Sequence, residues 1–232
     1  MNSRSQILCA WSGILCPLVM FIGLWPMAGF LPPHDPTASA ADIAAIYQQH
    51  ANGIRLGMIF IMLAGALFAP FVASISAQLR RVENSKTPVL SYTQLSAGTA
   101  GILLFIVPAL IFTGAAYRPE RPADITQALN DLGWICFVMP FVLALIQNLA
   151  IGFAIISDRN ARPIFPRWLG FFNFWIALLF VPGGLLTFFR TGPFAWNGLL
   201  AFWVPACIFG PWFWVMAAYV IKAAKQQALE AR

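Results

Sequence analysis

Six long stretches of the sequence contain no charged side chain, and this feature restricts the possible folds more than any other. They cover residues 7–31, 56–79, 95–116, 132–156, 168–189 and 199–221. Each is longer than the roughly 20 residues that a helix needs to cross about 30 Å of hydrocarbon. Because lipid cannot hydrogen bond to a backbone, such stretches must satisfy their own peptide groups, as helices do. The sequence therefore predicts an all-α, polytopic membrane protein with six transmembrane helices in a bundle.

The composition agrees with a membrane protein of one domain. Of the 232 residues, 60% are hydrophobic and only 9% are charged, whereas soluble domains are roughly 25% charged. The six stretches use most of the chain, so we expect residues 1–232 to form a single transmembrane domain. The net charge of +6 is spread over several loops, so we expect no nucleic acid partner.

The basic residues predict the orientation in the membrane, because Lys and Arg are enriched in cytoplasmic loops. With the N-terminus inside, only four basic residues lie outside: Arg55, Arg118, Arg121 and Arg190. The other ten lie inside. We therefore expect a multi-pass protein of the cell membrane with both termini in the cytoplasm. The first stretch exceeds the roughly 7–15 apolar residues of a signal peptide, so we expect it to be retained.

Every stretch contains at least one proline. These residues are Pro17, Pro26, Pro70, Pro108, Pro140, Pro182, Pro205 and Pro211. Proline removes a backbone hydrogen bond and bends a helix, a defect that membrane helices tolerate when neighbours satisfy the freed group. The pattern predicts bent helices around a shaped interior. Pro182-Gly183-Gly184 is the main candidate for a hinge or a helix break, with a static kink as the alternative.

The first outer loop carries a predicted helix of its own. Ser39 and Asp42 have the spacing of a capping box, and apolar residues follow at helical intervals as far as Tyr47. We expect a short amphipathic helix along the outer surface of the membrane. Asn52-Gly53 is expected to interrupt it before the second span.

Two patterns concern the packing of the spans. The chain can be divided into three hairpins whose returning spans each open near an asparagine, which indicates a hairpin repeat or a chance recurrence. Small residues at helical spacing, Gly53 with Gly57 and Ala69 with Ala73 and Ala77, let backbones approach closely. They serve either internal packing or dimerisation.

Two groups of residues are predicted to bind a ligand. Gln147, Asn148 and Asn173 are the most polar side chains within the spans. Because lipid cannot satisfy their amides, they must face protein or a cavity, where they either join helices or bind a polar group of a ligand. At the outer rim, the ligand-binding candidates are Arg55, Asp131 and Arg190. Arg55 and Asp131 could also pair and orient their helices.

The sequence argues against several kinds of chemistry. No ionisable residue needs to lie in the hydrocarbon core, which disfavours proton-coupled transport. Both histidines fall in the first outer loop, so no span offers histidine ligands for haem. The cysteines have no zinc-site spacing. We therefore expect no cofactor and no metal, and the sequence identifies no catalytic residues.

Three hypotheses on function follow. The first is a protein that binds or passes a small apolar or amphiphilic, lipid-like molecule, because the interior is aromatic and uncharged. The second is a non-catalytic subunit or scaffold that contacts a membrane-protein partner or its own copies. The third is an interfacial enzyme that acts on a lipid-like substrate through His50, Glu120, Asp124 and Asp131.

Overall fold

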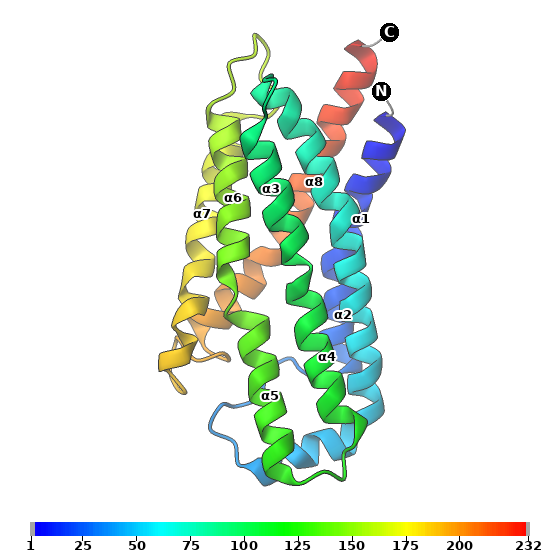
Figure 1. The fold of residues 1–232 in the computed structure, drawn as a ribbon, viewed down its shortest axis with the longest axis vertical. Helices are drawn as coiled ribbons and strands as arrows, with labels where there is room; N and C mark the ends of the chain where they lie inside the picture. The colour runs from blue at the N-terminus through cyan, green and yellow to red at the C-terminus, as the bar shows by residue number, and fades with distance from the viewer. Residues whose placement is uncertain (1–2, 231–232) are drawn as a thin grey trace.

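The computed structural model describes residues 3–230, which form an all-α bundle with no strand in that range (Figure 1). Six helical spans are long and apolar enough to cross a membrane: Ser3–Met27, Ala40–Glu83, Val89–Tyr117, Ala123–Ile156, Arg167–Phe188 and Leu199–Glu230. The prediction of an all-α polytopic bundle with six spans is thus confirmed. The protein is a multi-pass membrane protein.

Five of the six spans consist of two helical elements in succession. The elements are α1 (Ser3–Ile22) with the π-helix η1 (Gly23–Met27), α2 (Ala40–Glu83) alone, α3 (Val89–Gly101) with α4 (Leu103–Tyr117), α5 (Ala123–Val138) with α6 (Phe141–Ile156), α7 (Arg167–Phe180) with the 3₁₀-helix η2 (Val181–Phe188), and the π-helix η3 (Leu199–Trp203) with α8 (Val204–Glu230). Each of these five spans is therefore interrupted once along its length.

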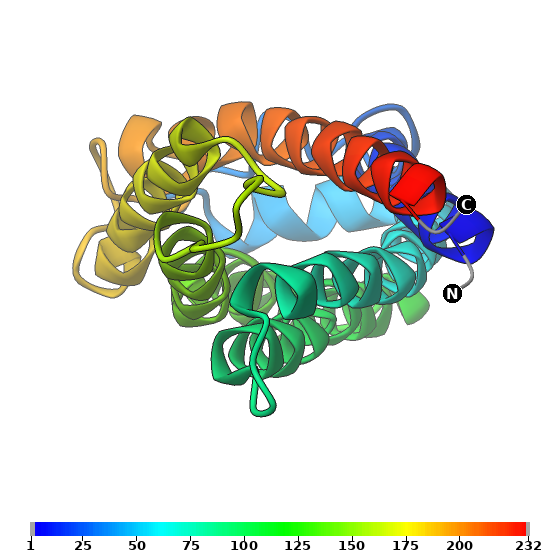
Figure 2. The same ribbon diagram turned by 90° about the horizontal axis from the view of Figure 1, so that it is seen from above.

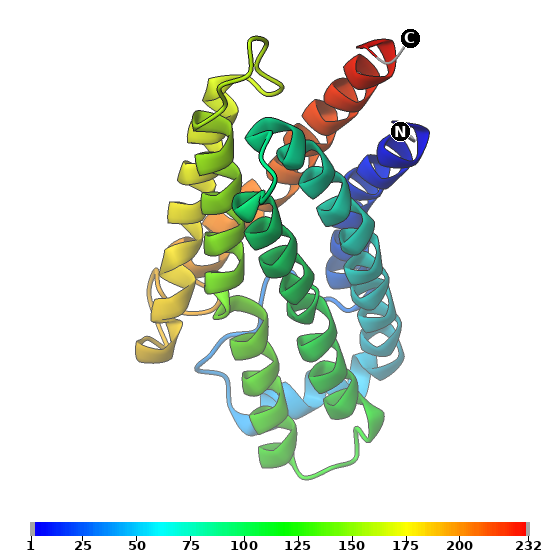
Figure 3. The same ribbon diagram turned by 45° about the horizontal axis from the view of Figure 1, so that its top comes forward.

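The spans are arranged in chain order around a ring, as the view along the bundle shows (Figure 2). Each span packs beside the next, and α8 returns to lie along α1. The contact between α7 and α8 is much smaller than that between α6 and α7. In Figure 3 these two helices diverge toward the end that holds the termini.

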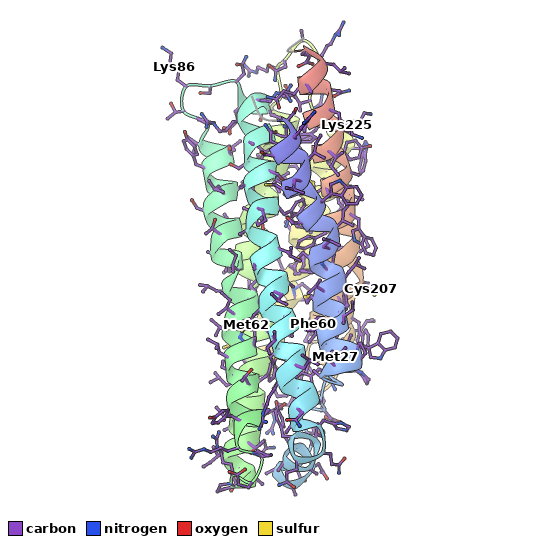
Figure 4. All side chains as sticks on the ribbon, turned by 90° about the vertical axis from the view of Figure 1, so that its right-hand side faces the viewer. Met27, Phe60, Met62, Lys86, Cys207 and Lys225 are labelled. Carbon is purple, nitrogen blue, oxygen red and sulfur yellow. The ribbon has the colours of Figure 1, made fainter. Side chains whose placement is uncertain are left out.

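Both ends of the described chain lie at the same end of the bundle, here called the termini end (Figure 1). An even number of crossings requires this arrangement. Lys86 and Lys225 lie at that end, while Met27 and Phe60 lie farther along the bundle (Figure 4). The clustering of basic residues agrees with the charge asymmetry of the sequence. The cytoplasmic orientation stays a prediction.

At the opposite end, residues 28–50, here called the cap segment, fold across the bundle. The predicted capping box is present, because the Ser39 hydroxyl accepts from the Asp42 N–H and the Asp42 carboxylate accepts from the Ser39 N–H. The first part of α2 then lies across the bundle axis (Figure 3). The predicted interruption at Asn52-Gly53 is wrong: the helix kinks at His50, where φ is −118° and ψ is 17°, and continues through both residues.

Prolines account for some interruptions but not for all. Interruptions lie beside Pro26, Pro140, Pro182 and Pro205, whereas α2 continues through Pro70. The break between α3 and α4 falls at Ile102, with no proline beside it. The expected helix break at Pro182-Gly183-Gly184 is confirmed as the start of η2.

The glycines of the predicted small-residue motif are used inside the molecule. A Cβ on Gly57 would lie 2.4 Å from the carbonyl oxygen of Gly23, and one on Gly53 would lie 2.5 Å from that of Met27. These glycines therefore let α2 approach the backbone of η1. Ala69 and Ala73, by contrast, are exposed on the outer face of α2.

Amide side chains join three helices at the termini end. The Gln78 amide of α2 donates to the side-chain oxygens of Gln6 in α1 and Gln227 in α8. Arg81 donates to the Gln78 oxygen at 2.7 Å and forms a salt bridge of 3.1 Å with Glu230. Contacts between side chains thus join α1, α2 and α8 at the termini end.

Candidate functional site

Two adjoining, partly open cavities lie between the helices of the bundle. Chamber 1 has a volume of about 110 Å³ and is lined by Met20, Phe21, Leu24, Leu104, Phe105, Phe137, Val138, Phe180, Ala201, Phe202, Pro205, Ala206 and Phe209. Chamber 2 has a volume of about 60 Å³ and is lined by Phe68, Gly101, Leu104, Phe105, Ala144, Gln147, Asn148, Phe180, Phe209, Trp212 and Phe213. Four residues, Leu104, Phe105, Phe180 and Phe209, line both. The chambers therefore adjoin at these four residues.

Chamber 1 lies where the helical spans are interrupted. Each lining residue except Phe209 is within three residues of the break in its own span. Breaks in all five interrupted spans therefore meet around one cavity. Irregular backbone at membrane depth is tolerated where it is buried in protein or lines a cavity, and π-helical turns often occur at functional sites.

Chamber 2 differs because a pair of amides forms part of its wall. Gln147 and Asn148, here called the carboxamide pair, are adjacent in α6 and only 4% and 2% exposed. The Asn148 Nδ2 donates to the Ala144 carbonyl at 2.8 Å. Among residues 3–230, the Asn148 Oδ1 and the Gln147 Nε2 find no hydrogen-bond partner. Two buried polar atoms thus remain unsatisfied beside an otherwise apolar cavity.

The third predicted amide has a different environment. Asn173 in α7 accepts a hydrogen bond of 3.0 Å from the Trp212 indole of α8 and donates to the Leu169 carbonyl at 2.8 Å. Its amide therefore joins α7 to α8, which was one of the two roles considered. Since Trp212 lines chamber 2, Asn173 also fixes one wall of that chamber.

On the side of chamber 1 away from the termini end, the cap segment is held by a buried polar cluster. His34, which is 7% exposed, makes a 2.7 Å hydrogen bond from Nδ1 to Asn130 Oδ1 of α5. The Tyr47 hydroxyl donates to the same oxygen at 3.2 Å. The Trp196 indole donates to the His34 carbonyl at 2.8 Å. Asn130 thus anchors both halves of the cap segment to α5.

Aromatic contacts connect this cluster to chamber 1. The Phe30 ring lies 4.9 Å from Phe112 and 5.6 Å from Trp134, measured between centroids. Trp134 in turn lies 6.0 Å from both Phe137 and Phe202, which line chamber 1. The cap segment therefore rests on the wall of the cavity through a continuous aromatic layer.

Burial lowers the pKa of His34, and the hydrogen bond to Asn130 opposes this only in part. A histidine with a lowered pKa is held neutral in the fold, whereas the unfolded chain takes up a proton near pH 6.5. The contribution of His34 to the free energy of unfolding is therefore complete above about pH 6.5. It is lost as the pH falls toward the pKa of the folded state.

We accordingly expect the melting temperature of the detergent-solubilised protein to fall between pH 7.5 and pH 5.0, and His34→Gln to show a flatter profile. Glutamine keeps a donor for Asn130 but does not titrate. The absolute stability of the variant is lower because the ring contacts are lost, so the slope against pH is the readout. If the melting temperatures of both proteins fell equally with pH, His34 would not be the cause of the pH dependence.

Of the three predicted residues of the outer rim, Asp131 and Arg190 interact electrostatically, whereas Arg55 binds a helix end. Arg55 donates from Nε and Nη2 to the Ala116 carbonyl, at 3.1 and 2.7 Å, and from Nη2 to that of Tyr117 at 3.0 Å. It thereby caps the C-terminus of α4. The suggested pairing with Asp131 is wrong: in the described part of the chain, Asp131 accepts from Asn130 at 3.3 Å and makes no salt bridge with Arg55. Arg190 is exposed.

Several buried residues have no signal in the sequence. Gln94 is fully buried and neither polar atom of its amide has a partner, but it falls just before an uncharged stretch. Trp212 and Trp134 look like any other aromatic residue of a span. His34 lies in a loop between two uncharged stretches, and no pattern in the sequence indicates its burial.

Most residues of the enzyme hypothesis lie at the surface. In residues 3–230, no three His, Cys, Asp or Glu side chains gather as metal ligands would. His50, Glu120 and Asp124 are exposed, while His34 is buried. Comparisons with protein-family models, curated proteins and solved structures give no match to this chain.

Proposed function

We propose that this membrane protein binds a small apolar or amphiphilic, lipid-like molecule in chambers 1 and 2. The observation that supports this most is the meeting of five helix interruptions around one apolar cavity. Interrupting a membrane helix costs hydrogen bonds, so five interruptions at one place need a reason beyond packing. A cavity shaped for a ligand supplies one.

The chemistry of the lining agrees with such a ligand. All residues of chamber 1 are apolar, and chamber 2 adds only the carboxamide pair to an apolar wall. Pockets for small molecules are mostly apolar with a few placed polar groups. An uncharged and largely hydrophobic ligand matches this surface.

The volume limits the size of the ligand. A cavity of about 150 Å³ is known to hold benzene in an apolar protein core. Chamber 1, at about 110 Å³, and chamber 2, at about 60 Å³, offer similar space together. Protein interiors are otherwise packed to crystal density, with few voids larger than a water molecule. We expect the chambers to hold a short chain or a ring rather than a complete phospholipid.

Filling chamber 1 tests the proposal. Ala206 lines the chamber, whereas the neighbouring Cys207 is exposed on the outside of α8. We expect Ala206→Phe to remove most bound hydrophobic molecule, measured by mass spectrometry of extracts from protein purified in a mild detergent. Cys207→Phe adds similar bulk on the lipid-facing side and is the matched control.

The expected result is at least a threefold lower molar ratio of bound compound in Ala206→Phe than in Cys207→Phe. Wild-type protein that carries nothing beyond general membrane lipid would contradict the proposal. The same holds if both variants retain the wild-type ratio. Thermal melting of each variant shows that the comparison is made on folded protein.

A further inference from the structure

The unsatisfied atoms of chamber 2 specify the polar end of the ligand. The carboxamide pair leaves a donor on Gln147 and an acceptor on Asn148 without partners. A buried polar atom without a partner destabilises the fold, because it has lost its hydrogen bonds to water. Both side chains are more than nine-tenths buried, and both residues belong to the lining of the chamber.

A hydroxyl group matches these two atoms. It accepts one hydrogen bond and donates another, so it can bind the Gln147 amide and the Asn148 oxygen at once. The oxygen and nitrogen of an amide can exchange places by a flip of the side chain. The bond from Asn148 to the Ala144 carbonyl fixes the Asn148 amide, and a hydroxyl satisfies either orientation of Gln147, because it can serve as donor or acceptor.

A charged headgroup does not match. Neither chamber is lined by Lys, Arg, His, Asp or Glu. A charge buried there would lack a partner of opposite sign, and such burial is far more costly than that of a neutral polar group. Carboxylates, phosphates and ammonium groups are therefore disfavoured at the carboxamide pair.

The different linings of the two chambers determine the orientation in which the ligand binds. Chamber 2 holds the polar pair, chamber 1 is apolar throughout, and the two share Leu104, Phe105, Phe180 and Phe209. Trp212 lines chamber 2 but its N–H is already engaged by Asn173, so it offers only its ring. The polar end thus has one binding position, beside α6.

We propose that chamber 2 binds the hydroxyl group of an uncharged amphiphilic alcohol through Gln147 and Asn148, with the apolar body of the alcohol in chamber 1. This inference rests on the proposed function. It adds the class of the ligand and the residues that select it. Asn173 acts as a positioning residue, because it holds the Trp212 wall.

The test compares three photoreactive probes in nanodiscs that contain the full-length protein. Each probe has the same 12-carbon chain with a diazirine near one end, and the other end is a hydroxyl, a methyl group or a carboxylate. They are present at equal mole fractions of the bilayer. The readout is labelling of the peptide that contains Ala206 and Phe209, quantified by mass spectrometry and competed by unlabelled dodecanol.

We expect the alcohol to label wild-type protein at least about fivefold more than the hydrocarbon, since each net hydrogen bond contributes about 1 kcal/mol. The carboxylate is expected to label no better than the hydrocarbon. In Gln147→Leu/Asn148→Leu, the preference for the alcohol should fall to about one, with hydrocarbon labelling retained as the sign of a folded, accessible chamber.

The possible outcomes separate this inference from the proposed function. Equal labelling of wild type by alcohol and hydrocarbon, or stronger labelling by the carboxylate, overturns the inference and leaves the proposed function standing. If neither neutral probe gives labelling that dodecanol competes, both are overturned. The wild-type ratios decide the matter even if the double variant cannot be purified.

Discussion

Replacing Gly57 with leucine is expected to prevent the first two spans from packing and to leave little folded protein. A Cβ at this position would lie 2.4 Å from the carbonyl oxygen of Gly23 and 2.8 Å from the Cβ of Ala28. The first is a backbone atom, which cannot rotate away. Overpacking that side chains can absorb costs about 1–3 kcal/mol, so we expect at least about 3 kcal/mol here.

The measurement is the free energy of unfolding in mixed micelles, together with the yield of monodisperse protein. Gly114→Leu is the matched control, because a Cβ on Gly114 meets nothing within 4 Å. We expect the control to stay within about 1 kcal/mol of wild type, since substitutions away from packed contacts are usually mild. Similar losses in both variants would mean that the contact between Gly23 and Gly57 is not the cause.

The second large effect is expected from Asn130→Leu. The change removes the acceptor of both His34 and Tyr47, and each stranded buried donor costs about 1–3 kcal/mol. We expect a loss of about 2–5 kcal/mol, together with faster amide hydrogen exchange in residues 28–50, because the cap segment loses its attachment to α5.

A double-mutant cycle with Tyr47→Phe tests the physical cause. In the wild-type background Tyr47→Phe removes a hydrogen bond and should destabilise by about 1 kcal/mol. In the Asn130→Leu background it removes a stranded hydroxyl and should be neutral or stabilising. Strict additivity of the two changes would show that the shared acceptor is unimportant. Asn52→Leu, at an exposed position, controls for replacing an asparagine of the same region.

The comparison of Gln147 and Asn148 with Asn173 shows how far the sequence can lead to a site. Their polarity within uncharged stretches requires that all three face protein or a cavity, which they do. Asn173 is satisfied by Trp212, whereas the carboxamide pair keeps two free atoms beside chamber 2. That difference depends on which side chains of other spans come within 3 Å, so no local pattern encodes it.

At the outer rim, the sequence led to a wrong pairing of two charged residues. Arg55 and Asp131 were expected to meet because both open a span at the same side of the membrane. Instead the Arg55 guanidinium binds the carbonyls at the end of α4, Ala116 and Tyr117. Backbone oxygens at helix ends lack partners within the helix and compete with carboxylates for arginine. Opposite charges at similar depth are therefore weak evidence for an ion pair.

The sequence by itself determined that this protein lies in a membrane, and it determined parts of the local structure. Charge-free stretches long enough to cross hydrocarbon define six spans, and Ser39 with Asp42 defines the start of α2, because hydropathy and capping act between residues close in the chain.

Only the tertiary structure decided where His34 lies and what surrounds the cavity. His34 binds Asn130, 96 residues away, and its carbonyl accepts from Trp196, 162 residues away. Chamber 1 needs walls from five spans. Contacts between distant segments depend on how whole helices pack, which is a property of the assembled bundle rather than of any one segment.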